Sequence, residues 1–99
     1  MPKKEYKIVR CSMGVFMGFL EPESTETVKV VTEAIRLWYW VGAASLSQMA
    51  IDGVKEPDKC KFPAPVDRIE LTSPSTGFEI LSVTDKAVES IKSVRPWKM

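Results

Sequence analysis

Residues 36–53 read RLWYWVGAASLSQMAIDG, and the fold expected for the rest of the chain is arranged around them. The stretch begins with a Trp-Tyr-Trp run, continues through small residues and ends in a helical pattern. Ser45 and Gln48 have the spacing of a capping box, in which each side chain bonds the backbone N–H of the other residue. With Gly53 as the stop signal, we predict a helix over residues 44–52, directly after the aromatic run.

The segments on either side of this stretch have the composition of β-strands. Alternating or β-branched residues predict strands over residues 6–11, 15–20, 27–31, 37–41, 66–72 and 78–83. Gly14 and Gly18 bracket the second strand, and a glycine inside a strand pattern marks a bulge or a sharp bend. A Ser-Pro-Ser-Thr-Gly turn separates the last two strands, so we expect them to pair as a hairpin. Residues 32–35 fit either a turn or a continued strand.

Two further segments complete the expected elements. Residues 55–65 contain three prolines and are expected to form an ordered loop. Thr84 is expected to cap a closing helix over residues 85–93, with an apolar face made of Ala87, Val88, Ile91 and Val94.

The order of these elements predicts an α+β fold in a single domain over residues 1–99. We expect a small bent antiparallel sheet, or alternatively a partly open barrel of the Sm or SH3 type, with two short helices. Residues 1–4 are expected to be a flexible basic arm and residues 95–99 a tail.

The composition excludes several classes of chemistry. Histidine is absent, which removes Ser-His-Asp and Cys-His catalysis and histidine metal sites. The acidic residues show no paired-carboxylate spacing, so we expect no enzyme, no cofactor and no metal site. Cys11 and Cys60 have no zinc-site spacing and are expected to be unpaired thiols.

Charge and hydropathy limit the partners in the same way. The net charge is +1, which lacks the global positive field of a protein that coats nucleic acid, so any anion site must be local. The sequence contains neither an apolar run of roughly 20 residues nor a signal-peptide pattern. We therefore expect a cytoplasmic protein without a membrane partner.

The tryptophans of the central stretch are the strongest candidates for binding. In a strand, Trp38 and Trp40 would share one face and Tyr39 would point to the other. Both indoles could simply fill the core, but one could instead stack on a base, which is worth ~1–3 kcal/mol per base. Arg36 would lie on the tryptophan side and bond phosphate or guanine there, with a surface ion pair as the alternative.

The start of the predicted helix is a second candidate. Gly42, Ala43 and Ser45 place small residues where backbone N–H groups and the positive end of the helix dipole can hold an anion, although small residues before a capping serine more often serve close packing. Gln48 would contribute its amide group. Lys61 in the proline-rich loop would meet a phosphate, with an ordinary solvated lysine as the alternative.

The sequence also resembles a family of small uncharacterised proteins encoded by phages and prophages. The resemblance is carried by residues 36–43, which match an Arg-x-Trp-Tyr-Trp-x-Gly-Ala core, by the Cys-Lys-Phe-Pro loop at residues 60–63, and by the tryptophan at position 97. It extends over residues 7–97. The resemblance implies a phage accessory protein with a domain of unknown function and assigns no activity.

Phage accessory proteins of this size commonly act against host defence. We therefore expect a non-catalytic protein that binds and sequesters a small, cyclic nucleotide signal as a homo-oligomer in the cytoplasm of the bacterial host. The expected ligand-binding residues are Arg36, Trp38, Trp40, Gly42, Ala43, Ser45, Gln48 and Lys61. The alternatives are an inhibitor that binds a host defence protein, and a nucleic-acid-binding Sm-like module.

Overall fold

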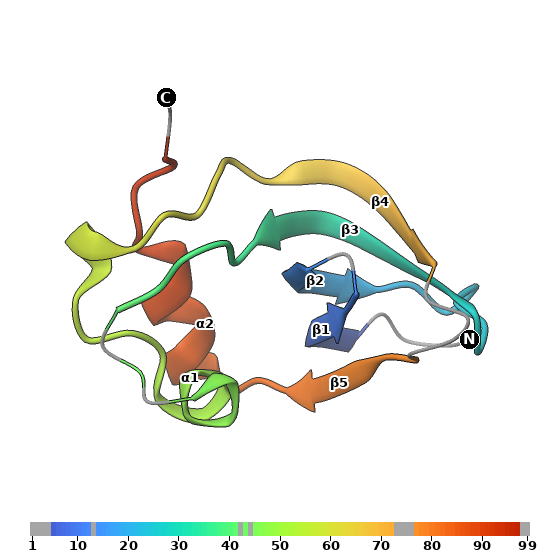
Figure 1. Cartoon of the computed structure of the whole chain (residues 1–99), viewed down its shortest axis with the longest axis horizontal. Coiled ribbons are helices and arrows are strands. Elements are labelled where there is room, and N and C mark those ends of the chain that lie inside the picture. Colours follow the sequence, from blue (N-terminus) through green and yellow to red (C-terminus); the bar gives the residue numbers. More distant parts are fainter. Residues whose placement is uncertain (1–4, 13, 42, 44, 73–76, 98–99) are drawn as a thin grey trace.

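The computed structural model describes residues 5–12, 14–41, 43, 45–72 and 77–97 as an α+β fold (Figure 1). Its strands are β1 (Glu5–Cys11), β2 (Gly14–Leu20), β3 (Val28–Arg36), β4 (Val66–Thr72) and β5 (Glu79–Ser82). They form one antiparallel sheet in the order β4-β3-β2-β1-β5. The helices are α1 (Leu46–Asp52) and α2 (Asp85–Lys92), with a 3-10 turn η1 (Pro57–Lys59) between them. The expected antiparallel sheet with two helices is confirmed, and the sheet is open.

The predicted hairpin between residues 66–72 and 78–83 is wrong. β4 pairs with β3, whereas β5 pairs with β1, so the two strands lie at opposite edges of the sheet. Figure 1 shows them on opposite sides of β1 and β2. Residues 73–76 of the predicted turn lie outside the described residues. Alternation in sequence identifies both strands correctly but carries no information about which strand each of them meets.

The predicted strand over residues 37–41 is also wrong. β3 continues through residues 32–35 to Arg36, and the chain then leaves the sheet with only an isolated bridge at Tyr39. Leu37 is buried while Trp38 and Tyr39 are both exposed, which breaks the two-residue alternation of a strand. The aromatic run therefore belongs to a connection between β3 and α1.

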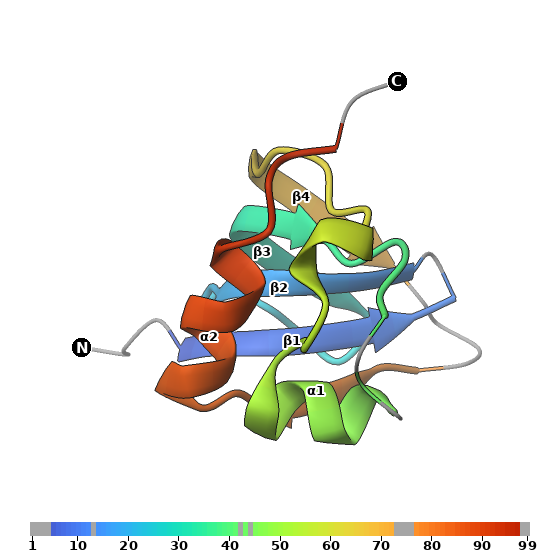
Figure 2. The same cartoon turned by 90° about the vertical axis from the view of Figure 1, so that its left-hand side faces the viewer.

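The sheet buries side chains on both of its faces. Ile8 and Met17 point to one face and pack with residues of α1 and α2, and both helices lie on this side of the sheet (Figure 2). Val9 and Phe16 point to the opposite face and form a second cluster with Leu71. Full burial of side chains of this size contributes roughly 1.5–3 kcal/mol each, so both faces stabilise the fold.

The second cluster is buried without a helix because the sheet curls around it. Phe78, in the segment that leads into β5, packs against this cluster. The Lys29 ammonium group of β3 lies 5.4 Å from the centroid of the Phe78 ring. Since β3 and β5 are not neighbours in the sheet, this contact requires strong curvature, as expected for a bent sheet.

A β-bulge lies at Gly18, the position that the glycine predicts, although the extra residue is in β3 and not in the second strand. Met17 pairs with Ile35 and Phe19 with Thr32, so Gly18 faces both Glu33 and Ala34 of β3. A Cβ atom on Gly18 would lie 2.6 Å from the Thr32 carbonyl oxygen, which leaves room only for glycine. The extra residue, Glu33, adopts a φ of 50°, an uncommon conformation for a residue other than glycine.

Both helices begin at the caps that the sequence predicts. The Ser45 hydroxyl accepts a hydrogen bond from the Gln48 N–H at 3.1 Å, and the Thr84 hydroxyl accepts one from the Ala87 N–H at the same distance. The expected apolar face of α2 is confirmed, because Ala87, Ile91 and Val94 are buried and Val88 is half-buried.

Gly53 ends α1 and sets how closely the helices approach. It has a φ of 78°, and a Cβ atom there would lie 2.3 Å from the Ser90 Cβ of α2. The Ser90 hydroxyl accepts a hydrogen bond from the Val54 N–H at 2.9 Å and donates one to the Val54 carbonyl at 3.0 Å. α1 and α2 therefore pack as one unit against the sheet.

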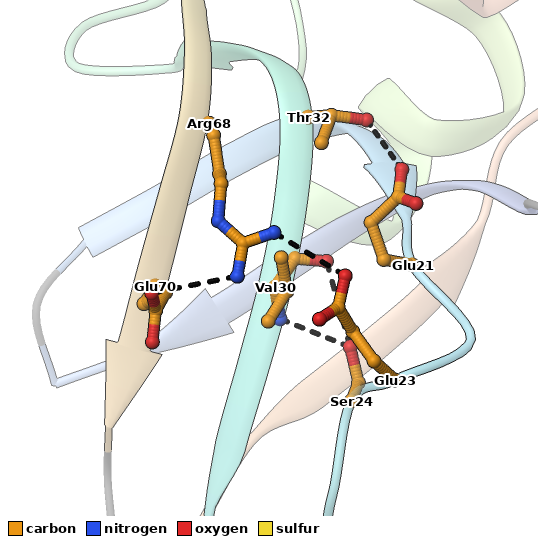
Figure 3. A network of polar contacts seen from close by, with 7 residues as sticks. All are labelled: Glu21, Glu23, Ser24, Val30, Thr32, Arg68 and Glu70. Atoms are coloured by element: carbon orange, nitrogen blue, oxygen red, sulfur yellow. Dashed lines mark hydrogen bonds and ion pairs between the residues drawn. The ribbon is translucent and has the colours of Figure 1, made fainter.

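A polar network ties the connection between β2 and β3 to the sheet (Figure 3). Glu21 is a buried carboxylate, 8% exposed, and its Oε2 accepts a hydrogen bond from the Thr32 hydroxyl at 2.5 Å. The Arg68 guanidinium of β4 donates to the Glu23 carboxylate at 3.2 Å. These hydrogen bonds attach the connection between β2 and β3 to the strands β3 and β4.

Both cysteines are free thiols, as expected. Cys60 is buried and Cys11 is half-buried. Among the described residues, no helix is both long enough and apolar enough to span a lipid bilayer.

Candidate functional site

Three segments from distant parts of the chain lie side by side at the helical end of the molecule. Tyr39 and Lys61 form an antiparallel bridge, in which the Lys61 N–H donates to the Tyr39 carbonyl at 2.7 Å. Phe62 and Pro96 form a parallel bridge, supported by the bond from the Trp97 N–H to the Phe62 carbonyl at 3.0 Å. The buried Phe62 side chain anchors this array in the core.

The array collects aromatic rings and cations on one surface, which we name the aromatic–basic surface: Arg36, Trp38, Tyr39, Lys61 and Trp97. The rings of Trp38 and Trp97 lie with their centroids 4.8 Å apart. The Lys61 ammonium group lies 5.6 Å from the ring centroids of both Tyr39 and Trp97, within the range of a cation–π contact.

A hollow of about 400 Å³ borders the aromatic–basic surface on the side of Arg36. Its lining includes Arg36, Trp38 and Trp40 together with Gly14 at the start of β2. The Arg36 guanidinium carbon lies 4.5 Å from the centroid of the Phe16 ring, which holds the side chain beside the hollow. The structure thus brings the predicted arginine and both predicted tryptophans together, although only Arg36 lies on a strand.

The two tryptophans have different surroundings. Trp38 is 58% exposed, whereas Trp40 is half-buried and packs against the core beneath the helices. Trp38 therefore presents most of its ring to a partner. Trp40 serves the core and reaches the hollow only with its remaining surface.

Of the residues predicted at the start of α1, those that the structure describes do not line the hollow. Ala43 packs against the core, and the Ser45 hydroxyl is used as the helix cap. Gln48 is half-buried on α1. Gly42 lies outside the described residues. α1 is only seven residues long, so its dipole supports an anion site weakly.

Tyr39 and Trp97 belong to the surface but were not among the predicted ligand residues. Tyr39 is 50% exposed and Trp97 is half-buried. Trp97 also lines a second hollow of about 350 Å³ together with Arg95. Local alternation assigns Tyr39 to the face opposite Trp38, and no local pattern links the Pro96-Trp97 pair to a loop 35 residues earlier in the sequence, at residue 62.

The arrangement is suited to binding a flat ligand. Exposed indole and phenol rings stack on planar groups, and the adjoining cations attract negative charge. Among the described residues, no group of three or more cysteine, aspartate and glutamate side chains is placed to hold a metal ion.

Comparison with known proteins identifies one family. The domain of unknown function DUF6948 matches residues 4–91 of the chain. Neither the curated proteins nor the solved structures include a significant match.

Proposed function

Since the chain belongs to the DUF6948 family, whose description assigns no activity, we propose from the geometry of the site that the protein binds a nucleotide, without chemical turnover, at the aromatic–basic surface. The observation that supports this proposal most is the Trp38 ring, which is 58% exposed and packs against Trp97. Arg36 lines the same hollow as Trp38, and the Lys61 ammonium group lies 5.6 Å from the Trp97 ring centroid.

In this proposal the base stacks on Trp38 and the phosphate lies toward the hollow that Arg36 borders. A base stacked on an aromatic side chain contributes about 1–3 kcal/mol. Arg36 is the better phosphate ligand of the two cations, because its planar guanidinium can donate two parallel hydrogen bonds. Lys61 adds a second positive charge near the rings without a fixed donor direction.

The likeness of residues 36–43 and 60–63 to phage-encoded proteins supports a biological setting for this binding. We place the protein among phage accessory proteins that sequester a cyclic nucleotide signal of the host's defence. A sequestering protein must bind tightly and hold its ligand away from other proteins, which favours a ligand shared between copies of a homo-oligomer. Sedimentation should then give a mass above the 11.1 kDa of one chain.

The test is a titration of the purified chain with nucleoside monophosphates, dinucleotides and cyclic oligonucleotides, followed by tryptophan fluorescence and by the melting temperature. We expect at least one cyclic nucleotide to quench the fluorescence and raise the melting temperature. Trp38→Ala and Lys61→Gln should each weaken that binding by about tenfold or more.

Ile51→Ala is the matched control, because Ile51 on α1 is also 58% exposed but is not part of the aromatic–basic surface. Its affinity should equal that of the wild type. If no nucleotide changes the fluorescence or the melting temperature, the proposal is wrong. The inhibitor of a host protein then becomes the leading alternative for this exposed aromatic surface.

A further inference from the structure

A second pocket, of about 280 Å³, lies between the sheet and α2 and shares no lining residue with the aromatic–basic surface. Its volume is at the lower end of small-molecule sites, so it suits a ligand with few atoms. The floor consists of the buried apolar side chains of Ile35, Phe62, Ile91 and Val94. Three prolines at the rim restrict the backbone, which keeps the pocket preformed.

Glu33 brings a carboxylate to this apolar pocket by means of the β-bulge. As the extra residue of β3, it holds a φ of 50°, a conformation that costs free energy and is concentrated at binding sites and active sites. Within the described part of the chain, the Glu33 carboxylate forms no ion pair and no hydrogen bond. An exposed negative charge that has no partner among the described residues therefore lies at one side of the pocket.

Lys92 of α2 brings the opposite charge. Its ammonium group lies 5.0 Å from the centroid of the Tyr6 ring, which is part of the pocket wall. Among the described residues, no ion pair joins Lys92 to Glu33. The Tyr6 hydroxyl is buried and has no hydrogen-bond partner among the described residues. The pKa of Tyr6 is raised, mainly because the side chain is buried and to a smaller extent because the Glu33 carboxylate is nearby.

The geometry points to a binding site for a small amphiphilic zwitterion of the α-amino-acid type, with its apolar side chain on the pocket floor, its ammonium group at Glu33 and its carboxylate at Lys92. A simple anion would meet the charge of Glu33, and a simple cation that of Lys92. A neutral apolar ligand would leave both charges unpaired. Only a ligand with both charges and an apolar group complements all three features of the pocket.

The experiment is an NMR titration of the ¹⁵N-labelled chain with L-leucine as the probe. L-Leucinamide lacks the carboxylate and represents a peptide's N-terminal residue, whereas N-acetyl-L-leucine lacks the ammonium group and represents a C-terminal residue. We expect saturable shifts of the Ile35, Ile91 and Lys92 amides with L-leucine, and affinities about tenfold or more weaker for both derivatives.

Glu33→Gln and Lys92→Gln should each weaken L-leucine binding by about tenfold or more, because each removes one of the two charges. Glu26→Gln and Lys86→Gln are the matched controls, since both residues are exposed and neither lines the pocket. Lys61→Gln, which tests the aromatic–basic surface, should leave L-leucine binding unchanged. An absence of saturable shifts, or equal affinities for L-leucine and its two derivatives, overturns the assignment.

Discussion

The ring of Trp38 packs against the ring of Trp97, with centroids 4.8 Å apart and ring planes inclined by 55°. The contact joins the connection after β3 to the segment that follows α2. Because the bridge between Phe62 and Pro96 positions Trp97, the exposure of Trp38 depends on residues far away in the sequence.

A double-mutant cycle can measure this contact. Trp38→Ala, Trp97→Ala and the double variant should give a coupling free energy of about 0.5–1.5 kcal/mol in urea unfolding, the usual range for an aromatic pair. A value near the lower end is expected because Trp38 is largely exposed. Additive effects of the two substitutions would show that the rings do not interact in solution.

Gly53→Ala should destabilise the protein by roughly 2 kcal/mol or more, because the new Cβ would meet Ser90 and the residue would keep a positive φ. Gly77→Ala is the control. Gly77 has a φ of 72°, but a Cβ atom there meets nothing within 4 Å. Thermal unfolding of both variants separates the cost of the positive φ from the cost of the clash with Ser90. Equal losses of stability in the two variants would mean that the clash with Ser90 is unimportant.

Thr32→Val should cost about 1–3 kcal/mol of unfolding free energy, because the buried Glu21 carboxylate loses the hydroxyl donor at 2.5 Å. Thr32→Ser keeps the hydroxyl and should recover most of the loss. Arg68→Gln should change the free energy of unfolding less than Thr32→Val does, because the ion pairs of Arg68 are exposed. Chemical denaturation of the three variants tests this order.

Tyr6 should make the folded protein less stable in alkali. The raised pKa of Tyr6 means that the neutral phenol is favoured in the folded state. The neutral phenol therefore contributes to the free energy of unfolding. This stabilisation is complete below pH ~10, the ordinary pKa of tyrosine, and is lost as the pH rises through the higher pKa of Tyr6 in the folded protein. Spectroscopic titration of tyrosinate in a Tyr39→Phe variant isolates Tyr6, and an ordinary or lowered pKa would contradict the prediction.

Tyr6→Phe should raise the free energy of unfolding by roughly 1 kcal/mol, because it removes a buried hydroxyl that has no partner among the described residues. The phenyl ring can keep the edge-to-face contact with Phe19, whose ring centroid lies 4.8 Å away. The loss of stability above pH ~10 should also be reduced in this variant. Urea unfolding at neutral and at alkaline pH measures both effects.

Local signals were sufficient for most of the elements. The capping residues Ser45 and Thr84 and the stop at Gly53 depend on neighbours within one helical turn, so the sequence predicts both helices well. Gly18 also marks the position of the bulge, although the extra residue lies in the paired strand β3. In contrast, the pairing of β5 with β1 depends on contacts across the whole chain, which local alternation does not encode.

The same limit applies to the candidate site. Arg36, Trp38 and Trp40 are close in sequence, and the structure places them around one hollow. The position of Trp97 beside Trp38 is set only when the sheet, α2 and the proline-rich loop assemble. The pocket that Glu33 and Lys92 line forms in the same way. The strained φ of Glu33 in particular follows from its register opposite Gly18, which requires the paired strands.

The position of β5 also has a consequence for biosynthesis. Lys7 in β1 bonds to Ser82 in β5, a partner 75 residues later. A ribosome that adds about 5–20 residues each second exposes β1 for several seconds before this partner is made. During that interval the first hairpin has an unprotected edge, so a nascent chain of this protein should depend on chaperones more than its small size suggests.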